Sequence, residues 1–128
     1  MQTKLPSRNF LNLADFDAAK VMALIESARV LKAGKPLDLA RGRTLGLVFL
    51  NPSLRTRVSM VGAFGWLGGT SVDLAPGQGM WKLATGSDPM LGDAAEHVDE
   101  AAGVLGRLCD VVGVRAFADG VDWRYDRK

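Results

Sequence analysis

The chain has 128 residues, and its 16 basic and 14 acidic side chains leave a formal net charge of +2. This length allows one domain with a hydrophobic core. So balanced a charge argues against nucleic acid or a membrane surface as the main partner. No apolar run is long enough to cross a bilayer, and the N-terminal segment lacks the apolar core of a signal peptide.

The single cysteine, Cys109, cannot form a disulfide within the chain, so we expect a reducing compartment, the cytoplasm. It lies in the apolar stretch 104–114, where a small buried hydrophobic side chain is a better interpretation than a reactive thiol. No cluster of histidines and cysteines with metal-ligand spacing is present, so no metal site is predicted.

Hydrophobic spacing predicts helices that alternate with strands. In chain order they are a helix over 15–32, a strand over 45–50, a helix over 56–67, a strand over 70–74, a helix over 93–108 and a strand over 110–115. Asp15 is the expected cap of the first helix, and Gly34 and Pro36 its end. Asp93 with Glu96 resembles a capping box for the third helix.

This alternation predicts an α/β fold with three layers, in which helices cover both faces of a parallel sheet, over residues 1–128. Ligands of such sheets bind beyond the carboxyl ends of the strands. Residues 53–57 follow the first strand, the long loop 75–92 follows the second, and Arg115 ends the third. We expect these three elements to share one edge of the sheet.

The junction between the first strand and the second helix predicts an anion site. Arg55 and Arg57 lie where unsatisfied backbone N–H groups and the positive end of a helix dipole are expected. Ser53 and Thr56 add hydroxyl donors, so the site suits a small, doubly charged oxyanion such as phosphate. The alternative is that Ser53 only caps the helix and both arginines are solvated.

Residues 49–57 read Phe-Leu-Asn-Pro-Ser-Leu-Arg-Thr-Arg, and Gly-Ala-Phe and Leu-Gly-Gly follow. This run resembles the carbamoyl-phosphate loop of aspartate and ornithine carbamoyltransferases, and it is closer to the branch that acts on N-acetylornithine or N-succinylornithine. Further matches are Pro76-Gly77 with Trp81, Glu96-His97, and the segments 104–107, 114–117 and 121–123. The resemblance implies a homotrimeric transferase of arginine biosynthesis without a cofactor, whose partners are carbamoyl phosphate and an ornithine derivative.

The resemblance also implies roles for single residues. Carbamoyl phosphate would be bound by Ser53, Leu54, Arg55, Thr56, Arg57, Trp81 and Arg115, of which Arg55, Thr56 and Arg115 would be catalytic. Arg57 would stand behind the loop as a supporting charge. Catalysis would rest on positioning and charge stabilisation, because the amine attacks a carbonyl while phosphate leaves.

Two segments of the family, His-Pro-x-Gln and His-Cys-Leu-Pro, are missing from this sequence. We therefore expect the N-terminal, carbamoyl-phosphate half of such an enzyme, without the amino-acid-binding domain and with little or no turnover alone. The alternative is an inactive binding or regulatory module of the same fold. An unrelated phosphate-binding domain is disfavoured, since no Walker loop or dinucleotide fingerprint is present. The acceptor remains open, because residues 82–92 depart from the family pattern.

Three side chains have simpler structural interpretations. Trp81 could fill the core of its own domain, although the resemblance favours a role in the site of a neighbouring subunit. His97 is expected in the middle of the third helix as a surface or packing residue. Arg115 could pair with Asp110 or Asp119, but its place at a strand end favours a ligand role.

Overall fold

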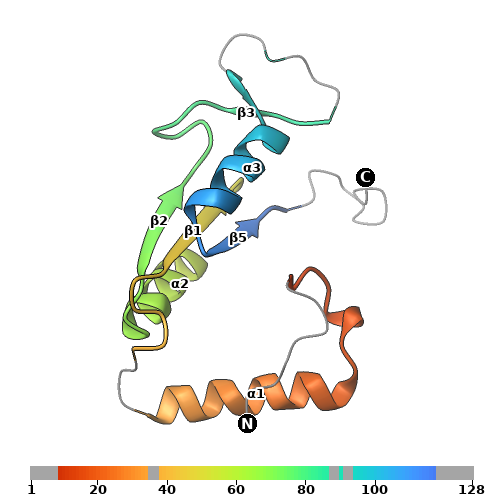
Figure 1. The fold of residues 1–128 in the computed structure, drawn as a ribbon. Helices are drawn as coiled ribbons and strands as arrows, with labels where there is room; N and C mark the ends of the chain where they lie inside the picture. The colour runs from red at the N-terminus through yellow and green to blue at the C-terminus, as the bar shows by residue number, and fades with distance from the viewer. Residues whose placement is uncertain (1–8, 35–37, 87–89, 91–93, 118–128) are drawn as a thin grey trace. The chain divides into compact units, whose positions relative to one another are not determined.

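The computed structural model describes residues 9–34, 38–86, 90 and 94–117. The chain divides into two compact units, Met1–Lys35 and Pro36–Lys128. The first unit holds a 3-10 helix, η1 (Leu13–Asp15), and helix α1 (Ala18–Ala33). The other elements of the described residues, five strands and two helices, belong to the second unit (Figure 1).

Helix α1 begins later than the sequence predicts. Its N-cap is Asp17, whose carboxylate accepts a hydrogen bond of 2.8 Å from the backbone N–H of Lys20. The prediction of Asp15 as the cap is wrong, because Asp15 ends η1 and the buried, extended Phe16 separates the two helices. Gly34 ends α1 as predicted, and Pro36 lies outside the described residues.

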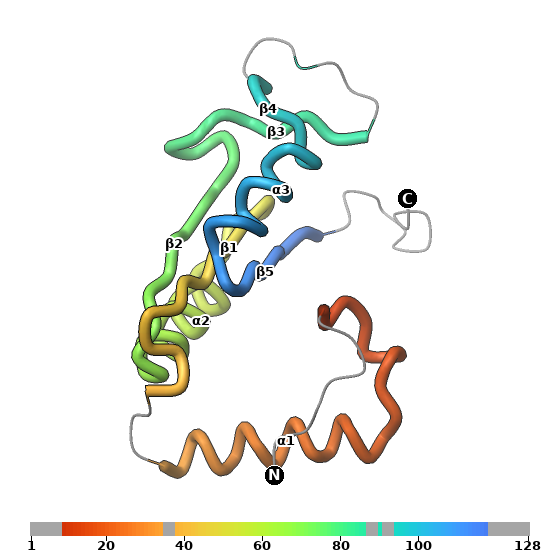
Figure 2. The backbone as a smooth tube through the Cα atoms, viewed as in Figure 1, coloured from red at the N-terminus to blue at the C-terminus, as the bar shows by residue number. Residues whose placement is uncertain are grey.

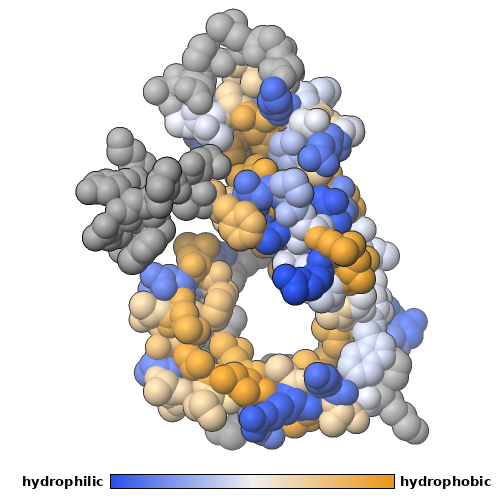
Figure 3. Space-filling view, turned by 180° about the vertical axis from the view of Figure 1, so that it is seen from behind, coloured by the Kyte–Doolittle hydropathy of each residue, from blue (hydrophilic) through white to orange (hydrophobic). Residues whose placement is uncertain are grey.

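Helix α1 leaves much of its apolar surface uncovered. None of its residues is buried, and Met22 and Val30 are among its exposed side chains. Apolar side chains also reach the surface elsewhere in the view of Figure 3. Within the described residues, no helix combines the length and apolar character that a membrane crossing needs.

Three parallel strands form the sheet of the second unit, in the order β2-β1-β5. They are β1 (Thr44–Phe49), β2 (Thr70–Leu74) and β5 (Val111–Arg115). The central strand β1 is buried at every residue after Thr44, which explains its nearly continuous apolar sequence. All three predicted strands are therefore confirmed to within one residue.

Helices α2 (Arg55–Trp66) and α3 (Val98–Leu108) lie on opposite faces of the sheet. The chain passes from β1 through α2 to β2, and then crosses back through α3 to β5 on the other side of β1. Right-handed crossovers in opposite directions place their helices on opposite faces, and Figure 1 shows α3 in front of the sheet and α2 behind it. The predicted three-layer α/β fold is confirmed.

Alternate residues of β1 serve the two faces of the sheet. Leu45, Leu47 and Phe49 form the core on the α2 side, where Phe64 packs against them. Gly46 faces Cys109, and a Cβ atom at Gly46 would lie only 2.9 Å from the Cys109 sulfur. The half-buried Cys109 thus has a packing role at the end of α3, and Gly46 is required for this close approach.

The start of α3 differs from the prediction. Glu96–His97 form a short strand, β4, which pairs in parallel with β3 (Leu83–Ala84) (Figure 2). The N-cap of α3 is His97, whose Nδ1 accepts a hydrogen bond of 3.2 Å from the backbone N–H of Asp99. Pairing with β3 keeps this segment extended. The predictions of a helix starting at 93, of a capping box at Glu96 and of His97 in the middle of the helix are therefore wrong. Asp93 lies outside the described residues.

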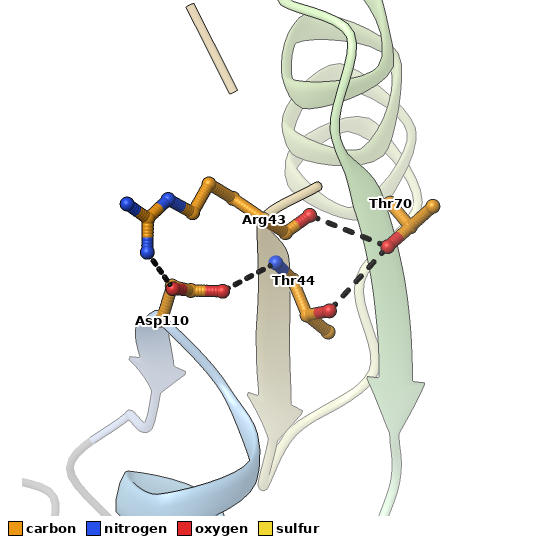
Figure 4. A network of polar contacts seen from close by, with 4 residues as sticks. All are labelled: Arg43, Thr44, Thr70 and Asp110. Atoms are coloured by element: carbon orange, nitrogen blue, oxygen red, sulfur yellow. Dashed lines mark hydrogen bonds and ion pairs between the residues drawn. The ribbon is translucent and has the colours of Figure 1, made fainter. Parts of the chain in front are cut away.

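A polar network joins the amino ends of the three strands (Figure 4). We call Arg43, Thr44, Thr70 and Asp110 the amino-edge clamp. The Asp110 carboxylate accepts from the Thr44 backbone N–H at 2.9 Å and from the Arg43 guanidinium at 2.5 Å. The Thr70 hydroxyl donates to the Arg43 carbonyl at 3.3 Å. The Thr44 N–H and then the Arg43 side chain hold the pKa of Asp110 below its ordinary value.

Candidate functional site

The carboxyl end of β1 is the point at which the topology of the sheet changes direction. The connections from β1 and from β2 lead to opposite faces of the sheet, so the strand order reverses beside β1. Open α/β sheets bind ligands at such a switch point, beyond the carboxyl ends of the strands. The segment 50–54, which joins β1 to α2, crosses this edge.

Strand β5 is attached to that segment by three hydrogen bonds. The Leu50 backbone N–H donates to the Arg115 carbonyl at 3.0 Å, and the Arg115 guanidinium donates to the Pro52 carbonyl at 3.1 Å. The Phe117 N–H donates to the Asn51 side chain at 2.6 Å. Arg115 therefore lies beside the loop that leads into Arg55, as the predicted order of strands and loops requires.

The N-terminus of α2 has no side-chain cap. Its N-cap is Leu54, whose side chain has no acceptor, and the hydroxyl of the half-buried Ser53 accepts no hydrogen bond from the described residues of the first turn. The interpretation of Ser53 as a simple cap is therefore wrong. The first backbone bond of the helix runs from the Val58 N–H to the Leu54 carbonyl at 3.0 Å. The N–H groups of the first turn, at the positive end of the helix, can therefore hold an anion.

The two arginines of the loop have different surroundings. Arg55 is exposed and makes no ion pair or side-chain hydrogen bond with any described residue. Arg57 is half-buried, with its Nε 2.8 Å from a carboxylate oxygen of Asp73 on β2 and its guanidinium 4.8 Å from the centre of the Phe49 ring. Arg55 thus has an uncompensated charge, whereas Arg57 fastens the first turn of α2 to the sheet.

Arg115 keeps donors for a ligand. Its guanidinium stacks 4.3 Å from the centre of the Phe117 ring and uses one Nη1 hydrogen for Pro52, and a guanidinium has five N–H donors. The alternative partner Asp110 pairs with Arg43 instead. Asp119, the other alternative, lies outside the described residues.

Thr56 and Trp81 complete the set of predicted site residues. Thr56 is exposed in the first turn of α2, and its hydroxyl has no partner among the described residues. Trp81 is 55% exposed, so it does not fill a core within the described part of the chain. Its indole N–H donates to the Glu96 carboxylate at 3.0 Å. No contact in the described ranges joins Trp81 to Arg55 or Arg115, so the structure does not bring it into the same cluster.

Sequence reasoning missed two contributors to this edge. Asn51 holds the chain after β5 through its side-chain amide, and Glu96 holds Trp81. Asn51 carried a usable signal, because an asparagine directly after a buried strand is a common partner for backbone groups. Glu96 belongs to a segment that matches the family, but its contact with Trp81 could not be predicted, because the two residues lie 15 positions apart. No group of three His, Cys, Asp or Glu side chains in the described ranges is arranged to hold a metal ion.

Known proteins resemble this chain over most of its length. Residues 8–125 match the family model described as aspartate/ornithine carbamoyltransferase, carbamoyl-P binding domain. The chain belongs to this family. An N-acetylornithine carbamoyltransferase from Xanthomonas campestris pv. campestris is 43% identical over 123 residues, which are 94% of this chain and 36% of that protein. An N-succinylornithine carbamoyltransferase from Bacteroides fragilis is 42% identical over 106 residues, or 81% of this chain and 33% of that one.

Solved structures of this carbamoyltransferase family share the fold. A crystal structure of acetylornithine transcarbamylase complexed with acetylcitrulline superposes with a TM-score of 0.83 at 41% identity, covering 94% of this chain and 36% of that one. A variant of N-acetyl-L-ornithine transcarbamylase complexed with carbamyl phosphate and N-succinyl-L-norvaline gives 0.83 at 41% identity and covers 94% and 37%. The resemblance stated from the sequence is confirmed. The chain spans about a third of the length of these relatives.

Proposed function

We propose that this chain is the carbamoyl-phosphate-binding part of an enzyme that transfers the carbamoyl group to the side-chain amine of an N-acylated ornithine in arginine biosynthesis. In this proposal residues 1–128 form the phosphate-donor domain, and a second domain binds the amino acid. The observation that carries it is the uncapped N-terminus of α2, where Arg55, which has no partner among the described residues, directly follows the loop 50–54 that Arg115 contacts. Family membership and relatives named for N-acetylornithine and N-succinylornithine support it.

The phosphate group is held at the start of α2. Arg55 supplies a planar, permanently charged fork, and the backbone N–H groups after Ser53 and Leu54 supply further donors. The Leu54 side chain is solvent-exposed, so its contribution is through the backbone. Arg57 acts behind this loop, because its contacts with Asp73 and Phe49 fix the direction of the first helical turn.

The carbonyl of the donor is polarised by Thr56 and Arg115. The ornithine amine attacks the carbonyl carbon, the bond between that carbon and the phosphate oxygen breaks, and phosphate leaves with the electron pair. Negative charge develops on the carbonyl oxygen during attack and on the phosphate as it departs. Preorganised cationic donors favour both changes without a metal or an organic cofactor.

The acceptor, the assembly and the compartment form the remaining part of the proposal. The acceptor is N-acetylornithine or a related derivative. The assembly is a cytoplasmic homotrimer in which Trp81 reaches the site of a neighbouring subunit. The exposed position of Trp81 supports such a role. The isolated chain binds the donor weakly and shows little or no turnover.

Calorimetric titration of carbamoyl phosphate and of inorganic phosphate tests the proposal. Arg55→Ala removes a charged bidentate contact and should weaken binding by about 10- to 100-fold, since hydrogen bonds to charged groups contribute about 1.5–3 kcal/mol. Arg107→Ala is the matched control. Arg107 is also an exposed arginine, but it lies in the last turn of α3, near the amino edge of the sheet and away from the proposed site. Equal affinities of the wild type and Arg55→Ala would contradict the proposal.

A further inference from the structure

Trp81 is an exposed aromatic side chain that is nevertheless held in place. The residue is 55% exposed, yet its indole N–H donates to the Glu96 carboxylate at 3.0 Å. A hydrogen bond to a charged acceptor is stronger than one between neutral groups. An exposed indole that is fixed in this way has lost rotamer freedom before any partner arrives, which is the condition for preorganised recognition.

The segment that carries Trp81 is fixed to the start of α3 at two further points. Leu83 and Ala84 pair with Glu96 and His97 as strands β3 and β4. The His97 Nε2 lies 3.0 Å from the Gly86 carbonyl. Because Nδ1 of the same ring accepts from a backbone N–H, the arrangement assigns the proton to Nε2, which donates to Gly86. The backbone on the C-terminal side of Trp81 is therefore anchored by backbone pairing and by His97, and the Glu96 side chain is left to orient the indole.

The location of Glu96 makes this contact specific. The half-buried Glu96 is one of the residues that line an apolar hollow on the α3 side of the sheet. The hollow is formed with Val48, Leu74, Ala101, Val104 and Leu105, among other apolar residues, and Glu96 is its only charged lining residue within the described part of the chain. A carboxylate beside apolar surface is costly unless it is hydrogen-bonded. The Trp81 indole supplies such a bond, so the two side chains constrain each other.

We propose that Glu96 is a positioning residue that fixes the indole of Trp81 in one orientation, so that the ring is presented to the N-acylated ornithine substrate. The inference rests on the proposed function, because the role of Trp81 belongs to it. It adds a residue of β4, directly before α3, to a site otherwise built from the ends of the other strands and from α2. Glu96 acts through Trp81 and contacts no reacting atom.

Time-resolved fluorescence anisotropy of Trp81 tests this role. In the full chain with Trp66→Phe and Trp123→Phe, Trp81 is the single tryptophan. Glu96→Met removes the acceptor but suits the apolar hollow, and Glu96→Ala serves if the methionine variant does not fold. Either should raise the amplitude of sub-nanosecond depolarisation about twofold, because a released exposed side chain samples several rotamers on that timescale. Glu96→Gln keeps a neutral acceptor and should restore most of the wild-type signal.

Two controls separate a positioning role from a general effect on folding. Glu26→Ala removes the same charge from an exposed position in α1 and should leave the depolarisation unchanged. Unchanged depolarisation in folded Glu96→Met or Glu96→Ala would overturn the inference. Failure of the wild type to bind carbamoyl phosphate would count against the proposed function, whereas the anisotropy result would still decide the role of Glu96.

Discussion

The two edges of the sheet differ in how their polar groups are satisfied. At the amino edge, Asp110 accepts from Arg43 and Thr44, and the Thr70 hydroxyl donates to the Arg43 carbonyl. At the carboxyl edge, Arg55 has no partner among the described residues. Charges that are matched within the chain hold strands together, whereas an unmatched charge at a helix N-terminus is available for a ligand.

The same comparison separates the arginines of the carboxyl edge. Arg57 is matched by Asp73 and lies against Phe49, so it resembles the residues of the amino-edge clamp. Arg115 is intermediate, because it contacts the Pro52 carbonyl and the Phe117 ring but no carboxylate in the described ranges. The comparison therefore predicts a large effect on ligand binding at Arg55, a smaller one at Arg115, and an effect on stability at Asp110.

After Arg55→Ala, the largest expected effect on ligand binding is that of Arg115→Ala. It should weaken carbamoyl phosphate binding about tenfold, because a charged hydrogen-bond donor is lost together with the contact that holds Pro52. Arg115→Lys keeps the positive charge but not the planar guanidinium, so its affinity for carbamoyl phosphate should lie between those of the wild type and Arg115→Ala. Calorimetry measures both. If Arg115→Ala bound carbamoyl phosphate as tightly as the wild type, Arg115 would have a structural role and no role in binding.

Asp110→Asn should act on stability and leave the ligand affinity unchanged. The substitution removes the negative partner of Arg43 and leaves an amide beside the guanidinium, so the midpoint of thermal unfolding should fall. Circular dichroism gives the midpoint, and a phosphate titration of the folded variant gives the affinity. A loss of phosphate affinity with an unchanged midpoint would reverse the assignment of the two edges.

The smallest expected effect is the pH dependence of the difference in stability between the wild type and Asp110→Asn. The pKa of Asp110 is lowered from 3.8 by the Thr44 N–H and then by Arg43. A lowered pKa means that the stabilisation is complete above the unfolded value and disappears as the pH falls through the lower, folded value. The difference in unfolding free energy between the wild type and Asp110→Asn should therefore be constant near neutral pH and vanish in strong acid. Asp17, whose pKa is also lowered, is present in both proteins and cancels.

Local sequence was sufficient for much of this fold. The apolar run of β1 requires burial on both faces, and that predicts a central parallel strand. The helix predicted over 56–67 is α2, Arg55–Trp66, and Gly68, with a φ of 86°, follows its end. The start of α3 could not be predicted, because it depends on the pairing of Leu83 with Glu96, which are distant in sequence. The pairing overrides the helical pattern of the residues themselves.

The same reasoning predicted part of the candidate site and missed one contact within it. Arg55 and Arg115 were predicted together because the carboxyl ends of adjacent parallel strands meet at one edge. The pairing of Arg57 with Asp73 was not predicted, since it requires the packing of the first turn of α2 against β2. The sequence thus predicts which residues lie at the ends of the strands, but it does not predict contacts between the side chains of two packed elements.

Nuclear magnetic resonance of the isotopically labelled chain tests the central claim most directly. Addition of carbamoyl phosphate should shift the backbone amide signals of Arg55 and Thr56 and the side-chain signal of Arg115. The amide signals of Thr44, Thr70 and Asp110 at the opposite edge should stay in place. Shifts centred on the amino-edge clamp, or no shifts at either edge, would contradict a phosphate site at the carboxyl end of the sheet.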